Sequence, residues 1–168
     1  MKKFLIVLLL AAAAAYFYLP YHTTEKLELA LKTADKAELE RLIDFPSVRQ
    51  SVKEQFKAKM EAKIAAQLPP GQAGSLMSNP GAAAAMGPMI DKMVDAMITP
   101  ESLTSLIKLD KTVSEERRYD LREKTWVSLT EFTARAHDRS IMRLRFEGSK
   151  GWRLVAMEMS EEMAKGGP

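Results

Sequence analysis

The sequence of 168 residues contains no cysteine and two histidines. The absence of cysteine excludes disulfides, thiolate nucleophiles, and zinc or iron–sulfur sites with cysteine ligands. His22 and His137 are too few for a histidine metal site, so an enzyme would depend on carboxylate, Lys, Arg, Ser or Tyr side chains. No nucleophile–base or metal-binding pattern of these residue types is visible in the sequence. We therefore predict no catalytic residues, no metal, no cofactor and no enzyme activity.

A large excess of charge of one sign is also lacking. The formal net charge of +3 includes Lys2 and Lys3, so the rest of the chain is close to neutral. Nucleic-acid-binding proteins need a concentrated basic surface that neutralises phosphates. We therefore predict no nucleic-acid partner. The length suffices for one domain with a sizeable core.

An uninterrupted apolar segment is present at residues 4–19. A helix over this segment is roughly 24 Å long, slightly shorter than the ~30 Å hydrocarbon core of a bilayer. Two interpretations are open. The basic start and the alanines that end at Ala15 suit a cleaved secretory signal, whereas the aromatic cluster at residues 16–21 is typical of a membrane–water interface. We favour an uncleaved transmembrane anchor.

The charges beside this segment predict its orientation. Lys2 and Lys3 are the only charged residues at that end, so the positive-inside rule places the amino terminus in the cytoplasm. For a bacterial source, the protein would contact the inner membrane through residues 4–19 and place its C-terminal domain in the periplasm. Signal cleavage would instead release it into the periplasm. The predicted organisation is a membrane anchor or signal segment at 1–21, a single α+β domain at 22–160 with a flexible Pro- and Gly-rich connection at 69–88, and a tail at 161–168.

Helical periodicity follows the apolar segment. Thr24 can cap a first short helix, and Asp35 with Glu38 three residues later resembles a capping box for a second. The residue before a proline is pushed out of the α region, while proline suits the first position of a helix. Phe45-Pro46 therefore marks a corner between that second helix and a long third one. Along the third helix, apolar residues recur every four positions at Val48, Val52, Phe56, Met60, Ile64 and Leu68.

The corner supplies the candidate structural residues Asp44, Pro46 and Arg49. Asp44 and Arg49 can form a carboxylate–guanidinium pair, or Asp44 can accept backbone N–H groups at the start of the new helix. We favour capping, because it requires only local geometry.

Later in the chain the periodicity changes from helical to alternating. Pro88 opens a helix that we expect to be buried on one apolar side, and Thr99 caps a short helix that starts at Pro100. Residues 110–124 are rich in charge and predict a solvated connector. Alternation then predicts three strands around Phe132 to Ala136, Met142 to Phe146 and Trp152 to Met159, with a turn at residues 148–151 and His137 in a surface turn.

The predicted fold class is therefore α+β. It has an N-terminal transmembrane or signal helix, four to five helices, and then a C-terminal three-stranded antiparallel meander packed on the helices.

Several of these features occur together in one known family. They are Asp35, Leu39, the Asp44-Phe45-Pro46 corner with Arg49, the Thr99-Pro100 helix start with Leu103, Phe132, and the closing Gly151-Trp152-Arg153-Leu154 strand. With them the chain resembles an uncharacterised bacterial family catalogued as domain of unknown function 2939. The resemblance implies a membrane-proximal bacterial domain and supplies no activity. The order of helices first and strands afterwards also looks like the nuclear-transport-factor-2-like fold.

The candidate residues for an apolar ligand pocket or core are Phe45, Met89, Met93, Met97, Phe132 and Trp152. Two interpretations are open for them. They can fill a core, as Met does readily, or they can line a pocket between helices and sheet for a lipid or another hydrophobic ligand. A Cu(I) site formed by the three methionines and Met86 is a third, less favoured interpretation, because these positions interleave with Ile90 and Val94.

The predicted function is a binding or interaction module of the cell envelope, with an envelope protein or lipid as its partner and an unknown oligomeric state. A carrier or sensor of a hydrophobic ligand is the alternative. Basic residues in the range 41–63 and on the strands either solubilise the surface or face an anionic bilayer, and we slightly prefer the former. The strand residues concerned are Arg135, Arg143, Arg145 and Arg153.

Overall fold

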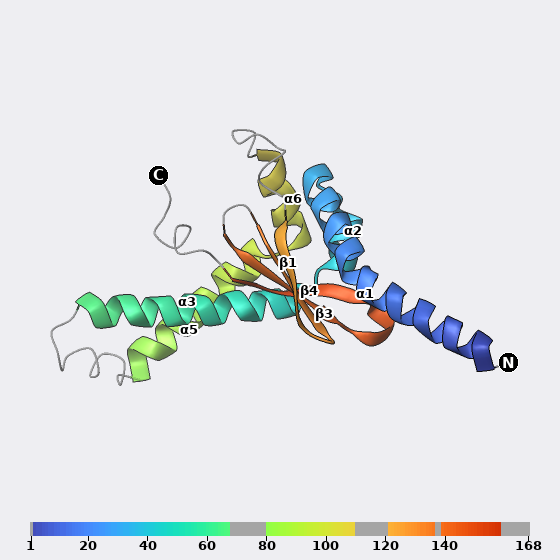
Figure 1. The fold of residues 1–168 in the computed structure, drawn as a ribbon. Helices are drawn as coiled ribbons and strands as arrows, with labels where there is room; N and C mark the ends of the chain where they lie inside the picture. The colour runs from blue at the N-terminus through green and yellow to red at the C-terminus, as the bar shows by residue number, and fades with distance from the viewer. Residues whose placement is uncertain (1, 68–79, 110–120, 137–138, 159–168) are drawn as a thin grey trace.

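The computed structural model describes residues 2–67, 80–109, 121–136 and 139–158 (Figure 1). The helices come first: α1 (Lys2–Thr33), α2 (Lys36–Leu42), α3 (Phe45–Gln67), α5 (Pro80–Met97) and α6 (Pro100–Leu109). The strands follow: β1 (Arg122–Ser128), β2 (Glu131–Arg135), β3 (Ile141–Phe146) and β4 (Trp152–Glu158). They form one antiparallel sheet in chain order. The predicted mixture of early helices and a late meander is confirmed, but the sheet in the described part of the chain has four strands rather than three.

The additional strand is β1, whose first three residues the sequence predicted as the end of a solvated connector at 110–124. Residues 110–120 lie outside the described residues. β1 escaped prediction because it is an edge strand with little apolar alternation, and only Lys124 and Trp126 in it are half-buried. It also departs from regular pairing near both ends, and Glu123 has a φ of 44°. Irregular, charged edges of this kind protect a sheet from pairing with other chains.

The helix α1 runs without a break from the apolar segment to Thr33, with Pro20 inside it. Thr24 therefore does not start a new helix. It is completely buried, and its hydroxyl donates to the carbonyl of Tyr21 at 2.7 Å. Proline and threonine are typical of helix starts, but here packing stabilises one continuous helix across them. The predicted segment boundary at residue 21 thus lies within α1.

The predicted corner is present between α2 and α3. Its backbone pairs with the sheet: the N–H of Asp44 donates to the carbonyl of Leu154 at 2.8 Å, and Ile43 forms a parallel bridge with the same residue. The carbonyl of Asp44 accepts the first helical hydrogen bond of α3 from the N–H of Val48 at 2.9 Å. Asp44 is therefore the residue at which the chain leaves the sheet and enters α3.

The carboxylate of Asp44 accepts a hydrogen bond from the Ser47 hydroxyl at 2.6 Å. The donor is thus the side chain of Ser47, in the first turn of α3. The sequence predicted that the Asp44 carboxylate accepts from backbone N–H groups of that turn. Pro46 lies in the same turn, where its missing N–H leaves no helical bond unmade. The two other predicted caps are confirmed: Asp35 accepts from the N–H of Glu38 at 3.2 Å, and Thr99 accepts from the N–H of Ser102 at 3.0 Å.

Among the described residues, the core consists of two clusters of buried side chains. The larger one joins α1, α2, α3, α5 and the ends of the sheet. The smaller one is centred on Phe132, Leu144 and Trp152. Phe132, Ala134 and Leu144 are fully buried, which confirms the predicted alternation in β2 and β3. On α3, Val48 and Val52 are buried and the next apolar positions of the predicted row, Phe56 and Met60, are partly buried.

The helix α5 begins at Pro80, eight residues before the predicted start at Pro88. Part of the expected flexible connection at 69–88 is therefore helical, and residues 68–79 lie outside the described residues. The physical reason is the run of four alanines after Gly81, because alanine has the highest helix propensity. Proline at the first position of a helix is favourable, which suits Pro80.

The Asp44 cap generates a stability prediction. Asp44→Ala should lower the free energy of unfolding of the full chain by about 0.5–2 kcal/mol, because the substitution removes the acceptor at the start of α3. Urea denaturation followed by circular dichroism measures this loss. Asp44→Asn is the matched control, since its amide oxygen can still accept from Ser47. An equal loss in both variants would contradict the capping role.

Candidate functional site

Aromatic side chains from α1 and the sheet meet where the apolar part of α1 leaves the domain. This aromatic cluster consists of Tyr16, Tyr21, Trp126, Phe132, Phe146 and Trp152. Tyr21 meets Phe132 edge-on, with 4.9 Å between ring centroids, and Trp126 meets Trp152 edge-on at 5.2 Å. Edge-to-face pairs at these distances are favourable beyond the area that they bury. The cluster therefore fixes α1 to the sheet.

Tyr16 occupies the outer side of the aromatic cluster. Its ring centroid lies 5.4 Å from that of Phe146 and 5.9 Å from that of Trp152. The Nε1–H of Trp152 is buried without a hydrogen-bond partner among the described residues, and the neighbouring rings offer it only the weak acceptors of their π faces. The hydroxyl of Tyr16 donates to the carbonyl of Leu129, in the turn between β1 and β2.

That turn forms the second part of the site. We call residues 127–130 the hairpin tip. Val127 is 58% exposed and Leu129 is 69% exposed, and on α1 the neighbouring Phe17 is 49% exposed while its ring packs on Trp126 at 5.2 Å. Apolar side chains are thus exposed on two elements that contact each other through Trp126 and Leu129, near the point where α1 leaves the domain.

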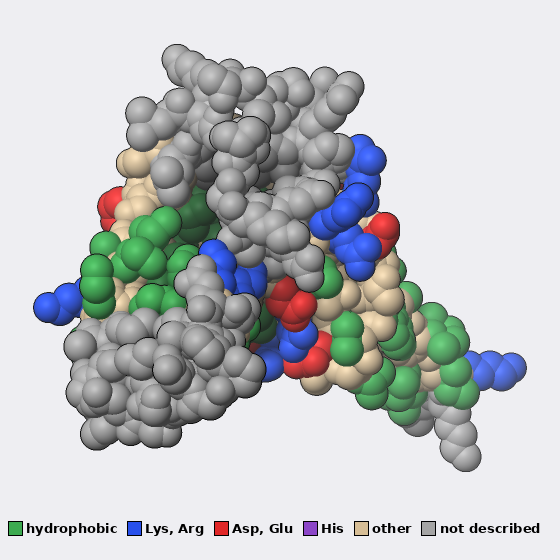
Figure 2. Space-filling model, turned by 90° about the vertical axis from the view of Figure 1, so that its left-hand side faces the viewer, with side chains coloured by type: hydrophobic (Ala, Val, Ile, Leu, Met, Phe, Trp, Pro, Cys, Tyr) green, Lys and Arg blue, Asp and Glu red, His purple; other side chains and the backbone are tan. Residues whose placement is uncertain are grey.

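Beyond Tyr16, the N-terminal half of α1 extends past the sheet (Figure 1). Its side chains from Lys3 to Ala12 are exposed, and the seven large apolar residues from Phe4 to Leu10 are each 57–73% exposed. Figure 2 shows such a projection, covered by hydrophobic side chains. The helical segment Lys3–Thr33 contains a stretch that is long and apolar enough to span a membrane. Only 6% of this stretch is buried in the protein. A signal sequence would meet the same criterion.

The six residues predicted to line a pocket or fill a core are not brought together. Phe45 is buried in the larger cluster, and Phe132 and Trp152 are buried in the smaller one. The methionines of α5 face outward: Met89 is 75%, Met93 is 41% and Met97 is 54% exposed. These six side chains therefore do not surround a common cavity.

The exposed methionines correct the expectation about the buried side of α5. Ile90 and Val94 are 7% and 1% exposed, so they alone form the buried row on the described part of this helix. Each methionine precedes one of these positions by one residue or follows it by three. Because one residue turns a helix by about 100°, the methionines lie on a different side of α5 from Ile90 and Val94. The sequence contains both rows at the same spacing, so periodicity did not distinguish them. The side chain of Met86 lies outside those described.

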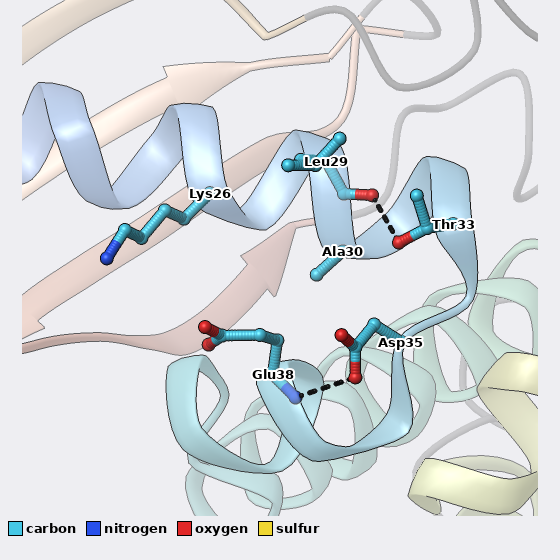
Figure 3. Close-up of a pocket in the computed structure, with 6 residues that line it drawn as sticks. All are labelled: Lys26, Leu29, Ala30, Thr33, Asp35 and Glu38. Carbon is cyan, nitrogen blue, oxygen red and sulfur yellow. Dashed lines mark hydrogen bonds between the residues drawn. The ribbon is translucent and has the colours of Figure 1, made fainter.

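A groove of about 530 Å³ lies between the C-terminal half of α1 and α2 (Figure 3). Its lining mixes charged, polar and apolar side chains: Lys26, Leu29, Ala30, Thr33, Asp35 and Glu38. Asp35 is engaged in capping α2, and the hydroxyl of Thr33 donates to the carbonyl of Leu29 at 2.9 Å. Nothing in this lining is specific for one class of ligand.

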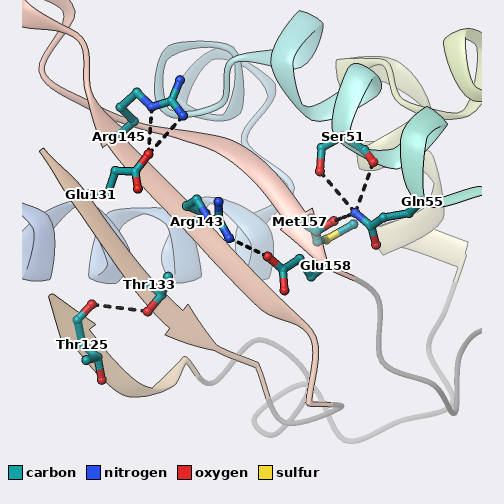
Figure 4. Close-up of polar contacts among 9 residues, drawn as sticks. All are labelled: Ser51, Gln55, Thr125, Glu131, Thr133, Arg143, Arg145, Met157 and Glu158. Atoms are coloured by element: carbon teal, nitrogen blue, oxygen red, sulfur yellow. Dashed lines mark hydrogen bonds and ion pairs between the residues drawn. The ribbon is translucent and has the colours of Figure 1, made fainter. Parts of the chain in front are cut away.

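The arginines of the strands are engaged within the protein (Figure 4 shows two of them). Arg143 pairs with Glu158 at 2.7 Å, and Arg145 pairs with Glu131 at 3.1 Å. The remaining pairs are Arg135 with Glu123 at 2.8 Å and Arg153 with Glu147 at 3.1 Å. Four positive charges are thus matched by four carboxylates, so this face of the sheet is not a basic surface for an anionic bilayer.

Arg153 has a further structural role. Its guanidinium donates to the carbonyls of Ile43 at 2.6 Å and Arg41 at 3.2 Å, and the side chain is 14% exposed. It therefore ties β4 to the end of α2. Beside it, Gln55 of α3 donates to the carbonyl of Met157 at 2.6 Å, which fixes α3 along β4.

Arg49 connects a different pair of helices. Its Nε–H donates to the carbonyl of Ile98 at 2.9 Å, at the C-terminal end of α5. A cation at this position satisfies a free carbonyl and opposes the negative end of the helix dipole. The alternative Asp44–Arg49 pair is not among the contacts of the described residues, and Asp44 uses its carboxylate for Ser47.

The exposed ion pair between Lys36 and Glu101 joins α2 to α6, with 2.6 Å between the charged atoms. Its hydrogen bond raises the pKa of Lys36 and lowers the pKa of Glu101. Because both groups are exposed, solvent and salt screen the pair and its effect on stability is small. In the part of the chain that the structure describes, no three His, Asp or Glu side chains are close enough to hold a metal ion. His137 lies outside that part.

Sequence reasoning did not identify the hairpin tip or Trp126 as site residues. The available signal was the run from Thr125 to Thr130, in which the β-forming residues Trp126 and Val127 stand shortly before the predicted strand at Phe132. The hairpin tip lies near α1 only because tertiary packing brings together residues far apart in the sequence. The contact between Tyr16 and Leu129, 113 positions apart, is an example.

A family model described as "Protein of unknown function (DUF2939)" matches residues 9–106, more than half of the chain. The chain therefore belongs to this family, as the resemblance in its sequence predicted. No curated protein and no solved structure matches the chain. The likeness to the nuclear-transport-factor-2-like fold thus has no support from a comparison.

The contacts of the strand arginines predict unequal effects of two substitutions on one sheet. Arg153→Leu should lower the free energy of unfolding by about 2–3 kcal/mol, because it leaves carbonyls at the end of α2 without a charged donor. Arg145→Leu should cost less than about 1 kcal/mol, because its ion pair is half-exposed. Urea denaturation of both full-length variants tests this order. Equal losses would show that Arg153 has no special role in joining β4 to α2.

Proposed function

We propose that this member of the DUF2939 family is a single-pass inner-membrane protein of bacteria whose α+β domain is a non-enzymatic interaction module in the periplasm. The observation that supports this best is the continuity of α1. One unbroken helix contains the exposed apolar segment and, after it, side chains that pack in the core of the domain, such as Leu27.

The exposure of the apolar segment favours a lipid environment. Burying one large apolar side chain is worth about 1.5–3 kcal/mol. With seven such residues between Phe4 and Leu10 largely exposed, transfer of this segment from water to hydrocarbon is favourable on the order of 10 kcal/mol, even when their partial burial is discounted. No described part of the domain covers these residues.

The region around Ala15 favours an anchor over a cleaved signal. Ala15 and Tyr16 are both helical, and the ring of Tyr16 is held between Phe146 and Trp152 of the sheet. A cleavage site at this position would be part of a helix that the folded domain already fixes. The orientation follows from Lys2 and Lys3, which favour a cytoplasmic amino terminus.

The absence of a linker defines what kind of module this is. Because α1 enters the domain directly, the domain stays against the bilayer rather than reaching away from it on a flexible tether. Side chains remote from the hairpin tip remain exposed on the domain, including Leu29 in the groove and Met89 on α5. Such residues are available for an envelope protein that approaches along the membrane surface.

The proposed topology predicts the activity of reporter fusions. An outside-active reporter fused after Pro168 should be active in a bacterial host, and a cytoplasm-active reporter at the same position should be inactive, because α1 places the C-terminus across the membrane. Fusion of the same two reporters before Met1 is the matched control and should show the reverse pattern. A cytoplasm-active C-terminal fusion would contradict the proposed orientation.

Retention of the anchor is tested separately. Protein extracted from membranes after an alkaline carbonate wash should have the intact mass of the full chain, because α1 is a stable part of both the anchor and the domain. Cleavage after Ala15 would instead give a product that lacks residues 1–15 and is released by the wash. That product would show that the apolar segment is a signal sequence.

A further inference from the structure

We infer that the hairpin tip inserts into the membrane–water interface beside α1, so that the domain makes a second contact with lipid. This inference rests on the proposed function, because it requires α1 to span the membrane. In addition to α1, the hairpin tip would then contact the membrane, and the partner of this surface would be the lipid bilayer.

The length of α1 supports a position of the hairpin tip at the membrane–water interface. The residues from Lys3 to Ala15 precede Tyr16, the first residue of α1 in the aromatic cluster, and at 1.5 Å per residue they span roughly 20 Å. The hydrocarbon core is ~30 Å thick and requires about 20 helical residues. A full span that begins at Phe4 would end near Thr23, roughly 10 Å beyond Tyr16. Residues level with Tyr16 therefore lie at the membrane–water interface or just below it, and not in the water beyond the headgroups. Tilting α1 would shorten its reach across the membrane and bring the sheet closer still.

A direct contact sets the position of the hairpin tip along α1. The Tyr16 hydroxyl donates to the carbonyl of Leu129, so the tip lies level with a residue inside the apolar segment. Val127 and Leu129 are more than half exposed, and the ring of Phe17 of α1 packs on Trp126, the residue before Val127. Trp and Tyr are the residues that membrane proteins place at the interface, and Tyr16 and Trp126 occupy this level.

The polar backbone of the tip is suited to a place with little water. An unsatisfied N–H or C=O is costly near hydrocarbon. Here the carbonyl of Leu129 accepts from the Tyr16 hydroxyl, the carbonyl of Thr130 accepts from the N–H of Phe146 at 2.9 Å, and the N–H of Thr130 donates to the Ser128 hydroxyl at 3.3 Å. Three polar groups of an exposed turn are thus satisfied within the protein.

The first charged residue after the tip is Glu131, and its charge is neutralised. Its carboxylate pairs with Arg145 at 3.1 Å, and Glu131 itself is only half-buried. Both groups can therefore lie at the headgroup level, where water and lipid phosphates are present. The tip itself carries no charge.

Fluorescent labelling tests the inference directly, because the chain has no cysteine that must first be removed. Leu129→Cys in the full-length protein is labelled with an environment-sensitive fluorophore and reconstituted into phosphatidylcholine vesicles. Some vesicles contain lipids with a nitroxide quencher on the headgroup, and others contain lipids with the quencher at the centre of the acyl chain. Leu29→Cys is the matched control, since Leu29 has a similar exposed fraction of 61% and lies far along α1. Leu9→Cys reports on the anchor.

The expected result is strong quenching of the 129 label by the headgroup nitroxide, several-fold above that of the 29 label, and quenching of the 9 label by the acyl-chain nitroxide. If the 9 label is quenched but the 129 and 29 labels are equally unaffected by either lipid, the hairpin-tip contact is overturned and the anchor stands. If the 9 label is not quenched, the spanning helix is wrong, and the inference is overturned together with the proposed function. Both exposed leucines can be replaced without opening the core.

Discussion

The packing of Tyr16 and Tyr21 against the sheet is the contact on which the arrangement of the protein depends. Both residues lie on α1, which also carries the exposed apolar segment, and their rings meet Trp152 and Phe132. Because the helix is continuous, whatever holds its N-terminal half also sets the position of the sheet. An apolar segment joined by a flexible linker would leave the domain free to rotate, whereas this one restricts it to one orientation relative to α1.

A second set of contacts makes helices and sheet a single unit, and it is centred on β4. The bridge of Ile43 and the hydrogen bond of Asp44 to Leu154 join the corner to this strand. Arg153 adds charged donors to carbonyls at the end of α2, and Gln55 adds a contact from α3. The strand arginines, which the sequence placed on a solubilising or membrane-facing surface, thus hold the fold together, because their hydrogen bonds end on backbone carbonyls or carboxylates of the same domain.

The differences between expectation and structure have separate physical causes. The strand β1 is an edge, and the charged and irregular residues that keep an edge from pairing with other chains replace the apolar alternation of an inner strand. The methionine row of α5 has the same spacing as the buried row, so sequence periodicity could not show which of them faces the core; Val94 is 1% exposed, whereas Met89 is 75% exposed. Thr24 and Pro20 are helix-start residues by local propensity, but tertiary packing of α1 overrides that preference.

The sequence by itself determined the features that depend on neighbours along the chain. These are the apolar segment at 4–19, the caps at Asp35 and Thr99, the corner at Asp44 and the alternating strands around Phe132, and they follow from local hydrogen bonding and periodicity. The tertiary structure alone decided which exposed residues meet. Leu129 lies beside Tyr16 although 113 positions separate them, and only the closure of the sheet onto α1 creates that contact. The candidate membrane surface is therefore a property of the fold, since no local pattern encodes a contact across such a distance.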